Sequence, residues 1–405
     1  MHIAVLAPTH KSFIADFLPN INSDELPEGI LSAPFIGTII KELLLNKNTV
    51  TAITCTLAIN NDYSIKRFKS DNFEWIVVPY RPHSIRFNGS KIGRILDFFL
   101  LEQQNMIKYI KDVHPDIVHA HWSYEYAGAA LNSGYPHLIS VHDNAIKVLY
   151  FYKNFYRLCR LIMSEVILRK ASYVSTISPY MWLYTKHRCQ NAKIIPMPTL
   201  VNTDLTEINS LISKKTNSLN SPSIIMINNG WDKRKNGKKG LLAFQLLKKT
   251  IPNASLHLFG QGSEVGGAAY KDAKSIGLDN INYYGLVPHK ILKEELSKAH
   301  LLLHPSLEES FGVILIEAMA IGIPAIGGIK SGAVPWVLNN NLLEVDVTNA
   351  KTVELKMLEL LSNPIVYKKV ATTSYENVLN RFSGSSVVQQ YMDYYQKILS
   401  AYKKQ

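Results

Sequence analysis

The sequence has few cysteines and no long apolar run. Three of its 405 residues are cysteines, Cys55, Cys159 and Cys189, and their spacing fits neither a disulfide framework nor a metal site. No stretch approaches the roughly 18 apolar residues of a membrane span. The start of the chain, MHIAVLAPTH, lacks a secretory signal pattern. We therefore expect a cytoplasmic protein, and peripheral attachment to the inner face of a membrane stays open.

Acidic residues are scarce in one part of the chain. The formal net charge is +12, and residues 151–200 contain eight Lys or Arg but a single acid, Glu165. Such an excess favours anionic partners, namely nucleic acid, acidic lipid or a phosphorylated substrate. A composition of 47% hydrophobic and 19% charged residues is typical of a globular protein and not of a disordered chain.

Short apolar runs alternate with helical patterns along the whole chain, which predicts α/β domains with parallel sheets. The pattern stops in a segment rich in Ser, Asn and Thr and then restarts with SIIMIN. We expect an N-terminal domain at 1–202, a linker at 203–222, a second domain at 223–380 and a C-terminal helix at 381–405 that packs back on the first domain. Both domains would be Rossmann-like and doubly wound, with the carboxyl ends of their sheets facing a central cleft.

Two acids bracket an apolar run in the stretch PSLEESFGVILIEAMA. Glu309 and Glu317 have seven residues between them. LLLHPS is a predicted strand, so Glu309 lies in the loop at its carboxyl end, and the backbone N–H groups of Ser310, Phe311 and Gly312 point out of the next helix. These acids could hold a ligand. Alternatively, Glu309 is an acid favoured by the helix dipole, and Glu317 is solvated.

A basic loop, NNGWDKRKNGKKG, follows the first predicted strand of the second domain. Cations at the end of a strand can stabilise the charge that develops on a leaving diphosphate. The alternative is a solvated basic turn before a helix.

The stretch HPSLEESFGVILIEAMAIGIPAIGG resembles the signature of the family 4 retaining glycosyltransferases, which have the GT-B fold. The resemblance extends through SGAVPWVL, FGQGSE and YYGLVP. It implies transfer of a sugar from a nucleotide diphosphate sugar to a hydroxyl acceptor with retention, in the synthesis of cell-surface polysaccharide or glycolipid. It implies neither a metal nor another cofactor, and the sequence has no Asp-x-Asp motif.

The resemblance also implies roles for the residues of the glutamate motif. Glu309 would contact hydroxyls of the donor sugar, and the backbone amides of Phe311 and Gly312, next to Ser310, would help to fix the sugar ring. Glu317 would bind the ribose hydroxyls of the nucleotide.

In the basic loop, Lys235 matches the lysine of the family. The family has an arginine directly after the glycine, but here Trp231 follows Gly230. Arg234 is the candidate to replace that arginine, and Lys233 could assist it. The diphosphate would be neutralised by these side chains.

The first domain offers fewer candidates. His142 follows a predicted strand in ISVHDN, and by resemblance it would lie near the donor sugar, so Glu309, Lys235 and His142 form the predicted catalytic set. Gly29 is the candidate for a turn near the diphosphate and the acceptor, although a plain loop glycine fits equally well. The pair His119 and His121 could bind a metal, but no acid or thiol lies close by in the sequence.

Residues 146–171 combine basic, aromatic and aliphatic side chains. As one amphipathic helix, this segment could lie on an anionic membrane surface, which suggests a lipid-linked acceptor or a growing polysaccharide. A core helix with a solvated basic edge is the alternative.

Other functions fit less well. A nucleic-acid-binding protein would explain the charge, but the glutamate pair would oppose a polyanion, so we expect no nucleic-acid partner. A nicotinamide oxidoreductase would need a G-x-G-x-x-G motif after the first strand, which is missing. An epimerase or phosphorylase with the same fold stays open.

Overall fold

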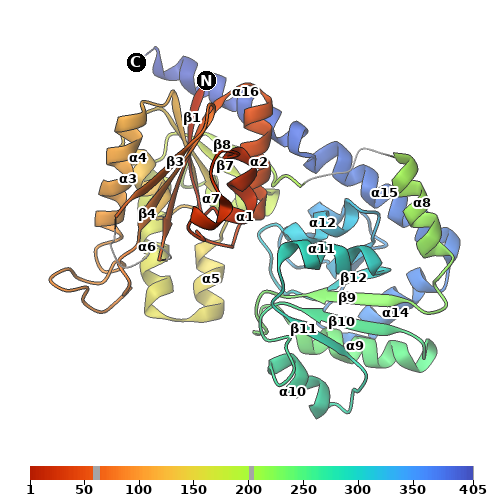
Figure 1. The fold of residues 1–405 in the computed structure, drawn as a ribbon. Coiled ribbons are helices and arrows are strands. Elements are labelled where there is room, and N and C mark those ends of the chain that lie inside the picture. Colours follow the sequence, from red (N-terminus) through yellow and green to blue (C-terminus); the bar gives the residue numbers. More distant parts are fainter. Residues whose placement is uncertain (58–63, 200–204, 405) are drawn as a thin grey trace. The chain divides into compact units, whose positions relative to one another are not determined.

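The chain forms two compact units in a computed structural model that describes residues 1–57, 64–199 and 205–404 (Figure 1). Unit 1 contains Met1–Pro198 together with Gly384–Gln405, and unit 2 contains Thr199–Ser383. Each unit is built around its own parallel sheet, as the alternation of apolar runs and helical patterns predicts.

The sheet of unit 1 has eight strands among the described residues, in the order β3-β4-β2-β1-β5-β6-β7-β8. All neighbours are parallel except β3 and β4. The strands are β1 (His2–Leu6), β2 (Thr49–Thr56), β3 (Lys66–Lys69), β4 (Phe73–Pro79), β5 (Ile117–His121), β6 (His137–Val141), β7 (Val174–Thr176) and β8 (Ala192–Ile194). The strand order reverses between β1 and β5, as in a doubly wound sheet.

The helices of unit 1 connect these strands, and the last one comes from the end of the chain. They are α1 (Lys11–Ile14), α2 (Pro34–Leu45), α3 (Leu100–Val113), α4 (Glu125–Asn132), α5 (Ala145–Tyr152), α6 (Phe155–Lys170), α7 (Pro179–Thr185) and α16 (Gly384–Tyr402), with short 3₁₀ turns at Ala15–Phe17 and Ser23–Glu25. The α16 helix packs on unit 1 through buried tyrosines, and the Tyr395 hydroxyl lies 2.6 Å from Nδ1 of His119.

The sheet of unit 2 has six described strands in the order β11-β10-β9-β12-β13-β14, all parallel. They are β9 (Ser223–Ile227), β10 (Ser255–Phe259), β11 (Asn282–Gly285), β12 (Leu301–His304), β13 (Ala325–Gly328) and β14 (Glu344–Val345). The helices are α8 (Leu205–Thr216), α9 (Gly237–Thr250), α10 (Ala268–Ser275), α11 (His289–Lys298), α12 (Val313–Met319), α13 (Val334–Leu338), α14 (Ala350–Leu361) and α15 (Pro364–Phe382). This order reverses between β9 and β12, which makes their carboxyl ends the switch point where such sheets bind ligands.

The segment predicted as a linker differs in the structure. Residues 203 and 204 lie outside the described part of the chain, and α8 begins at Leu205. Ile208 and Ile212, one helical turn apart, are buried, so this stretch has an apolar face despite its many polar residues. From Leu205 onward the chain therefore packs as part of unit 2.

The prediction of a single helix at 146–171 is wrong. Lys153 adopts a left-handed conformation, with φ of 42°, and it ends α5. The side chain of Asn154 then accepts a hydrogen bond from the backbone N–H of Arg157 and caps α6. The result is a hairpin of two helices, visible beneath the sheet of unit 1 in Figure 1.

Candidate active site

The basic loop and the glutamate loop lie side by side in unit 2. They follow β9 and β12, which are paired and parallel, so both loops leave the same edge of the sheet. The backbone N–H of Leu307 donates to the carbonyl oxygen of Arg234 at 2.8 Å, and the Asn236 side-chain amide donates to the carbonyl oxygen of Pro305 at 3.0 Å. Two segments about 70 residues apart in sequence therefore form one surface at the switch point of the sheet.

Glu309 is surrounded by cationic and polar groups. Its Oε1 lies 2.6 Å from Nζ of Lys235 and 3.3 Å from Nε2 of His304, and its Oε2 lies 3.9 Å from the Arg234 guanidinium. Burial by itself would raise the pKa of Glu309, but the charge of Lys235, with His304 and Arg234, holds the pKa well below its usual range. Glu309 is therefore ionised at neutral pH.

The backbone around Glu309 is also fixed. Glu309 forms a parallel bridge with Gly332, and its carbonyl oxygen accepts a hydrogen bond of 2.9 Å from Ala333. The Ser331 hydroxyl donates to the carbonyl oxygen of Ser306 at 2.6 Å. The loop after β13 thereby supports the glutamate loop, which keeps the carboxylate in place before a ligand binds.

Glu317 has a different partner from Glu309. Its Oε1 lies 3.0 Å from Nε2 of His289, the first residue of α11, and both side chains are partly buried. Within α12, Leu315 and Ile316 face the core, whereas Glu317 keeps 14% of its side-chain surface accessible. The proposed role of Glu317 in ligand binding stays a prediction. The sequence analysis did not predict His289 as the partner of Glu317.

The three residues that follow Glu309 have different roles. Phe311 is 2% exposed, and its ring packs against Trp336 and Phe382, so only its backbone can meet a ligand. Gly312 has φ of 92°, and a Cβ there would crowd the Leu315 side chain at 2.9 Å. Glycine is therefore required at this turn. Ser310 lies between Glu309 and Phe311 and is partly exposed.

Trp231, which follows Gly230 in the basic loop, makes structural contacts. Its indole N–H donates to Asp272 of α10 at 2.9 Å, and its ring covers Gly237, where any Cβ would clash with it. Trp231 therefore packs away from the glutamate loop as a structural residue. The Arg234 guanidinium instead lies 3.6 Å from Oε2 of Glu308, beside Glu309.

The remaining basic-loop candidates lie nearby. Lys233 is exposed to solvent, whereas Lys235 is buried. Gly230 has φ of 103°, a conformation that favours glycine, and the space around it is open apart from Asp232.

Several buried polar groups at this edge were missed by the sequence analysis. The side-chain amide of Asn228, which follows β9, is 99% buried with no hydrogen-bond partner for either of its polar atoms among the described residues. The hydroxyls of Ser263 and Ser306 are likewise buried and unpartnered. Buried polar groups without partners are costly, so a ligand or water is expected to satisfy them. In the sequence, Asn228 could have been found as a polar residue directly after a buried strand.

In unit 1, His142 follows β6 and belongs to a buried cluster of histidines. Its Nε2 lies 2.9 Å from Nδ1 of His121, and its ring packs on Trp122 and Phe35. Burial lowers the pKa of His142 to about 3, and it lowers the pKa of His119 to about 3 as well. These rings are neutral at pH 7, so His142 can donate or accept a hydrogen bond but cannot supply a positive charge.

The histidine pair of β5 does not converge on a common ion. The ring of His119 bonds to Ser140 at 2.7 Å and to Tyr395 at 2.6 Å, whereas His121 bonds to His142. Over residues 1–57, 64–199 and 205–404, no group of three or more His, Cys, Asp or Glu side chains is arranged to hold a metal.

Gly29 lies against the loop after β1. Its φ is 74°, and a Cβ would clash with the carbonyl oxygen of Thr9. The neighbouring Glu28 pairs with Lys11 at 2.7 Å and with His10 at 3.0 Å. Only glycine therefore permits this close approach at the carboxyl end of β1.

Comparison with known families agrees with this geometry. Residues 209–377 match the family model described as Glycosyl transferases group 1, and residues 39–205 match the model described as Glycosyltransferase Family 4. Most of both units therefore matches models of glycosyltransferase families. The resemblance that the glutamate motif suggested is confirmed, and each matched region covers most of one sheet.

Solved structures confirm the GT-B fold. Sucrose-phosphate synthase from Thermosynechococcus elongatus has a TM-score of 0.73 at 18% identity and covers 99% of this chain and 100% of its own. The Anabaena protein HepE, in complex with UDP and glucose, has a TM-score of 0.65 at 15% identity and covers 98% of this chain and 100% of its own. At these identities the likeness shows the fold alone.

Relatives in sequence match only part of this chain. N-acetyl-alpha-D-glucosaminyl L-malate synthase from Bacillus anthracis is 33% identical over 110 residues, which are 26% of this chain and 28% of that protein. The gpi3 subunit of phosphatidylinositol N-acetylglucosaminyltransferase from Schizosaccharomyces pombe is 27% identical over 122 residues, which are 30% of this chain and 26% of that protein. The match thus spans under a third of either relative. No helix of the described residues is long and apolar enough to cross a membrane.

Proposed function

We propose that the protein transfers a sugar from a nucleotide diphosphate sugar to a hydroxyl acceptor, with retention of the anomeric configuration. The observation that carries this proposal is the ionised Glu309 held between Lys235 and Arg234 at the switch point of the sheet. An anionic acceptor of hydrogen bonds beside two cations suits a ligand with sugar hydroxyls at one end and a diphosphate at the other.

Lys235 and Arg234, with Lys233 at the solvent edge, would neutralise the diphosphate. Glu309 would accept hydrogen bonds from the hydroxyls of the donor sugar, and the backbone N–H groups of Phe311 and Gly312 would fix its ring. Glu317 would accept hydrogen bonds from the ribose, and its contact with His289 keeps it in place for that role. The open turn at Gly230 would let the diphosphate approach the backbone.

The chemistry requires no enzymic nucleophile. The bond between the anomeric carbon and the diphosphate oxygen breaks, and the acceptor oxygen bonds to the same face of the sugar. The proton of the acceptor hydroxyl passes to the departing diphosphate oxygen. Positioning and electrostatic stabilisation of the leaving group would supply most of the rate. His142, which is neutral, would hydrogen-bond to the donor sugar, and Gly29 would line the approach of the acceptor.

The names of relatives and neighbours support two proposals about the substrates. The names of two relatives contain an N-acetylglucosaminyl group, and two structural neighbours were solved with UDP or a UDP-sugar, so UDP-N-acetylglucosamine is the first donor to test. We propose an acceptor that is a saccharide or is lipid-linked, in the synthesis of cell-surface polysaccharide or glycolipid. One relative acts on phosphatidylinositol by its name, and another is named for a cps region.

A donor-binding screen tests the proposal. Thermal shifts would be measured with UDP-, GDP-, ADP- and CMP-sugars on the wild type, on Glu317→Ala and on the control Glu376→Ala, which alters an exposed acid of α15. We expect a shift with one nucleotide class that is lost in Glu317→Ala and kept in the control. No shift with any donor would overturn the proposal in favour of a non-catalytic relative.

Product analysis tests two further parts of the proposal, namely retention of configuration and turnover without a metal ion. With a donor identified, the anomeric configuration of the product by NMR should match that of the donor. Because side-chain cations are proposed to neutralise the diphosphate, turnover should persist in EDTA. An inverted product, or a strict need for a divalent ion, would refute the corresponding part of the proposal.

A further inference from the structure

Apolar side chains are exposed in an unusual concentration on unit 1. Of the 23 large hydrophobic side chains that are exposed in the described chain, 12 come from residues 85–100 and 146–166. Scattered exposed hydrophobics are normal in soluble proteins, but a contiguous group marks an interaction surface.

Helix α6 shows the pattern most clearly. Its exposed side carries Phe155, Leu158, Ile162 and Val166, which are 42–53% exposed and spaced by three or four residues. Its other side buries Met163 and Leu168 in the core. A helix at the surface of a globular protein is normally polar on the side that faces water, whereas α6 is apolar on both sides. In the neighbouring α5, Ile146 and Tyr150 are exposed as well.

The segment before α3 continues this surface. Its exposed apolar side chains are Ile85, Phe87, Ile92, Leu96, Phe98 and Leu100. On its inner side, Ile95 and Phe99 pack in one cluster with Cys159 and Met163 of α6. Residues 83–100 and the α5–α6 hairpin are therefore two parts of one surface, which we call the apolar–basic surface.

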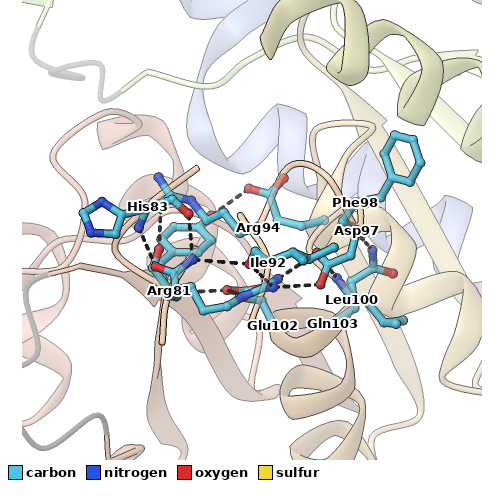
Figure 2. A network of polar contacts seen from close by, with 12 residues as sticks. Arg81, His83, Ile92, Arg94, Asp97, Phe98, Leu100, Glu102 and Gln103 are labelled. Carbon is cyan, nitrogen blue, oxygen red and sulfur yellow. Dashed lines mark hydrogen bonds and ion pairs between the residues drawn. The ribbon is translucent and has the colours of Figure 1, made fainter. Parts of the chain in front are cut away.

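Internal polar contacts hold the segment at residues 83–100 in place. The Arg81 guanidinium binds Asp97 at 2.7 and 2.8 Å and Glu102 at 2.7 Å, and it donates to the carbonyl oxygen of Ile92 at 3.0 Å (Figure 2). The Arg94 guanidinium in turn donates to the carbonyl oxygen of Arg81. Arg94 and Asp97 are thus used in contacts within the segment and with Arg81, whereas several of its apolar side chains are exposed.

The free charges on this surface are positive. Its exposed cations are Arg86, Lys91, Lys147, Lys153 and Lys170, together with Arg169, which lies 3.8 Å from Glu165. Its two acids are already neutralised, because Asp97 pairs with Arg81 and Glu165 pairs with Arg188 at 2.7 Å. A surface that combines exposed cations with apolar and aromatic side chains complements anionic phospholipid.

A groove of about 230 Å³ opens on the same surface between α3, α4 and α6. Phe98, Leu131, Ile162 and Val166 line it, and Lys170 and Asn132 lie among its lining residues. Its lining is mainly apolar and includes one cation, which suits an apolar chain next to an anionic group.

We propose that the apolar–basic surface docks unit 1 on an anionic lipid bilayer, with the groove receiving one acyl chain. The apolar stripe of α6 and the loop residues enter the headgroup region, and the lysines and arginines contact lipid phosphates. This inference goes beyond sugar transfer and stands independently of it, since it concerns a surface of unit 1 and the donor residues named above lie in unit 2 apart from His142 and Gly29. It extends the membrane contact expected for 146–171 to a second segment.

Vesicle binding tests the proposal. Full-length protein would be co-sedimented with phosphatidylcholine vesicles with and without phosphatidylglycerol. We expect binding to the anionic vesicles only. The double variant I162D/V166D should bind at least about tenfold more weakly, because it places charge on the apolar stripe. The variant K147Q/K153Q should bind roughly fivefold more weakly per lysine removed, and its binding should depend less on salt than that of the wild type.

Matched controls separate the possible outcomes. L355D/I365D places two charges at exposed apolar sites of unit 2 and should bind like the wild type. Circular dichroism and donor binding measured on all variants show that they are folded and that unit 2 is intact, so failure here is distinguishable from failure of the proposed function. Equal binding by wild type and I162D/V166D overturns the proposal. Concentration-dependent dimerisation that I162D/V166D abolishes, without vesicle binding, also overturns it and assigns the surface to a second copy.

Discussion

Nζ of Lys235 lies 2.6 Å from Oε1 of Glu309, although the two residues are 74 positions apart in the sequence. Both side chains are largely buried, at 10% and 12% exposure. The cation proposed for the diphosphate and the acid proposed for the sugar therefore neutralise each other before a donor binds. A buried pair of this kind is costly to break by removing one partner, because the other charge is left without compensation.

Replacing Lys235 with alanine should reduce both turnover and stability. We expect kcat to fall by about 10²–10³-fold, because a cation aimed at developing charge is lost. The free energy of unfolding should fall by about 1–3 kcal/mol, since Arg234 still partly neutralises Glu309. Turnover and urea denaturation measure the two effects. Lys238→Ala, an exposed cation of α9, is the control, and an equal loss there would contradict this account.

Replacing Glu317 should weaken donor binding more than it slows the chemical step. Hydrogen bonds to a charged group contribute about 1.5–3 kcal/mol each, so Glu317→Ala should raise the KM for the donor about 10–100-fold with kcat little changed. His289→Ala should give a smaller effect in the same direction, because it only removes the partner that positions Glu317. Steady-state measurements of kcat and of KM for the donor test this prediction. A fall in kcat alone would place Glu317 at the reacting centre instead.

The histidine cluster should make unit 1 sensitive to acid. The pKa of His119 and of His142 is about 3 in the folded state, against about 6.5 in an unfolded chain. Between these values the unfolded state binds protons that the folded state does not. Stability therefore falls as the pH drops from about 6.5 towards 3, by up to about 1.4 kcal/mol per pH unit for each histidine.

Hydrogen exchange of the β5 and β6 amides between pH 7 and pH 5 measures this loss locally. His119→Gln should make the pH dependence shallower by about one proton, and replacement of the exposed His83 should leave it unchanged. An unaltered slope in His119→Gln would show that His119 is already protonated in the folded state.

Replacing Arg81 with methionine should be strongly destabilising. Glu102 is 1% exposed and would keep a buried charge without its partner, at a cost of about 3–5 kcal/mol. The segment 83–100 should then become sensitive to limited proteolysis, because Arg81 also holds Asp97 and the carbonyl oxygen of Ile92. R81M/E102L should recover part of the loss. Arg169→Met is the control and should change little, because the Arg169 side chain is 75% exposed and its partner Glu165 keeps the ion pair with Arg188.

The sequence predicted the elements of both units well where the signal is local. LLLHPS was predicted as a strand and contains β12 (Leu301–His304), and the predicted strand in ISVHDN is the end of β6 (His137–Val141). Buried parallel strands are short continuous apolar runs, so each one can be recognised from its own residues.

The predictions from the sequence were wrong where weak local signals compete with tertiary packing. Residues 205–216 are rich in Ser, Asn and Lys, yet Ile208 and Ile212 are enough to bury one face of α8. The break at Lys153 requires a left-handed lysine, which no pattern of hydrophobic residues predicts. In both cases the tertiary contacts outweigh the local preference.

By itself, the sequence determined the α/β class, the glutamate motif with its family, and the presence of Lys235 and Arg234 in a basic loop. Those features depend on residue type and spacing along the chain. Only the tertiary structure decided that Trp231 turns to Asp272, that Arg234 lies beside Glu308, and that His289 holds Glu317. These contacts join loops from different strands, and they form only because parallel pairing brings the carboxyl ends of those strands to the same edge of the sheet.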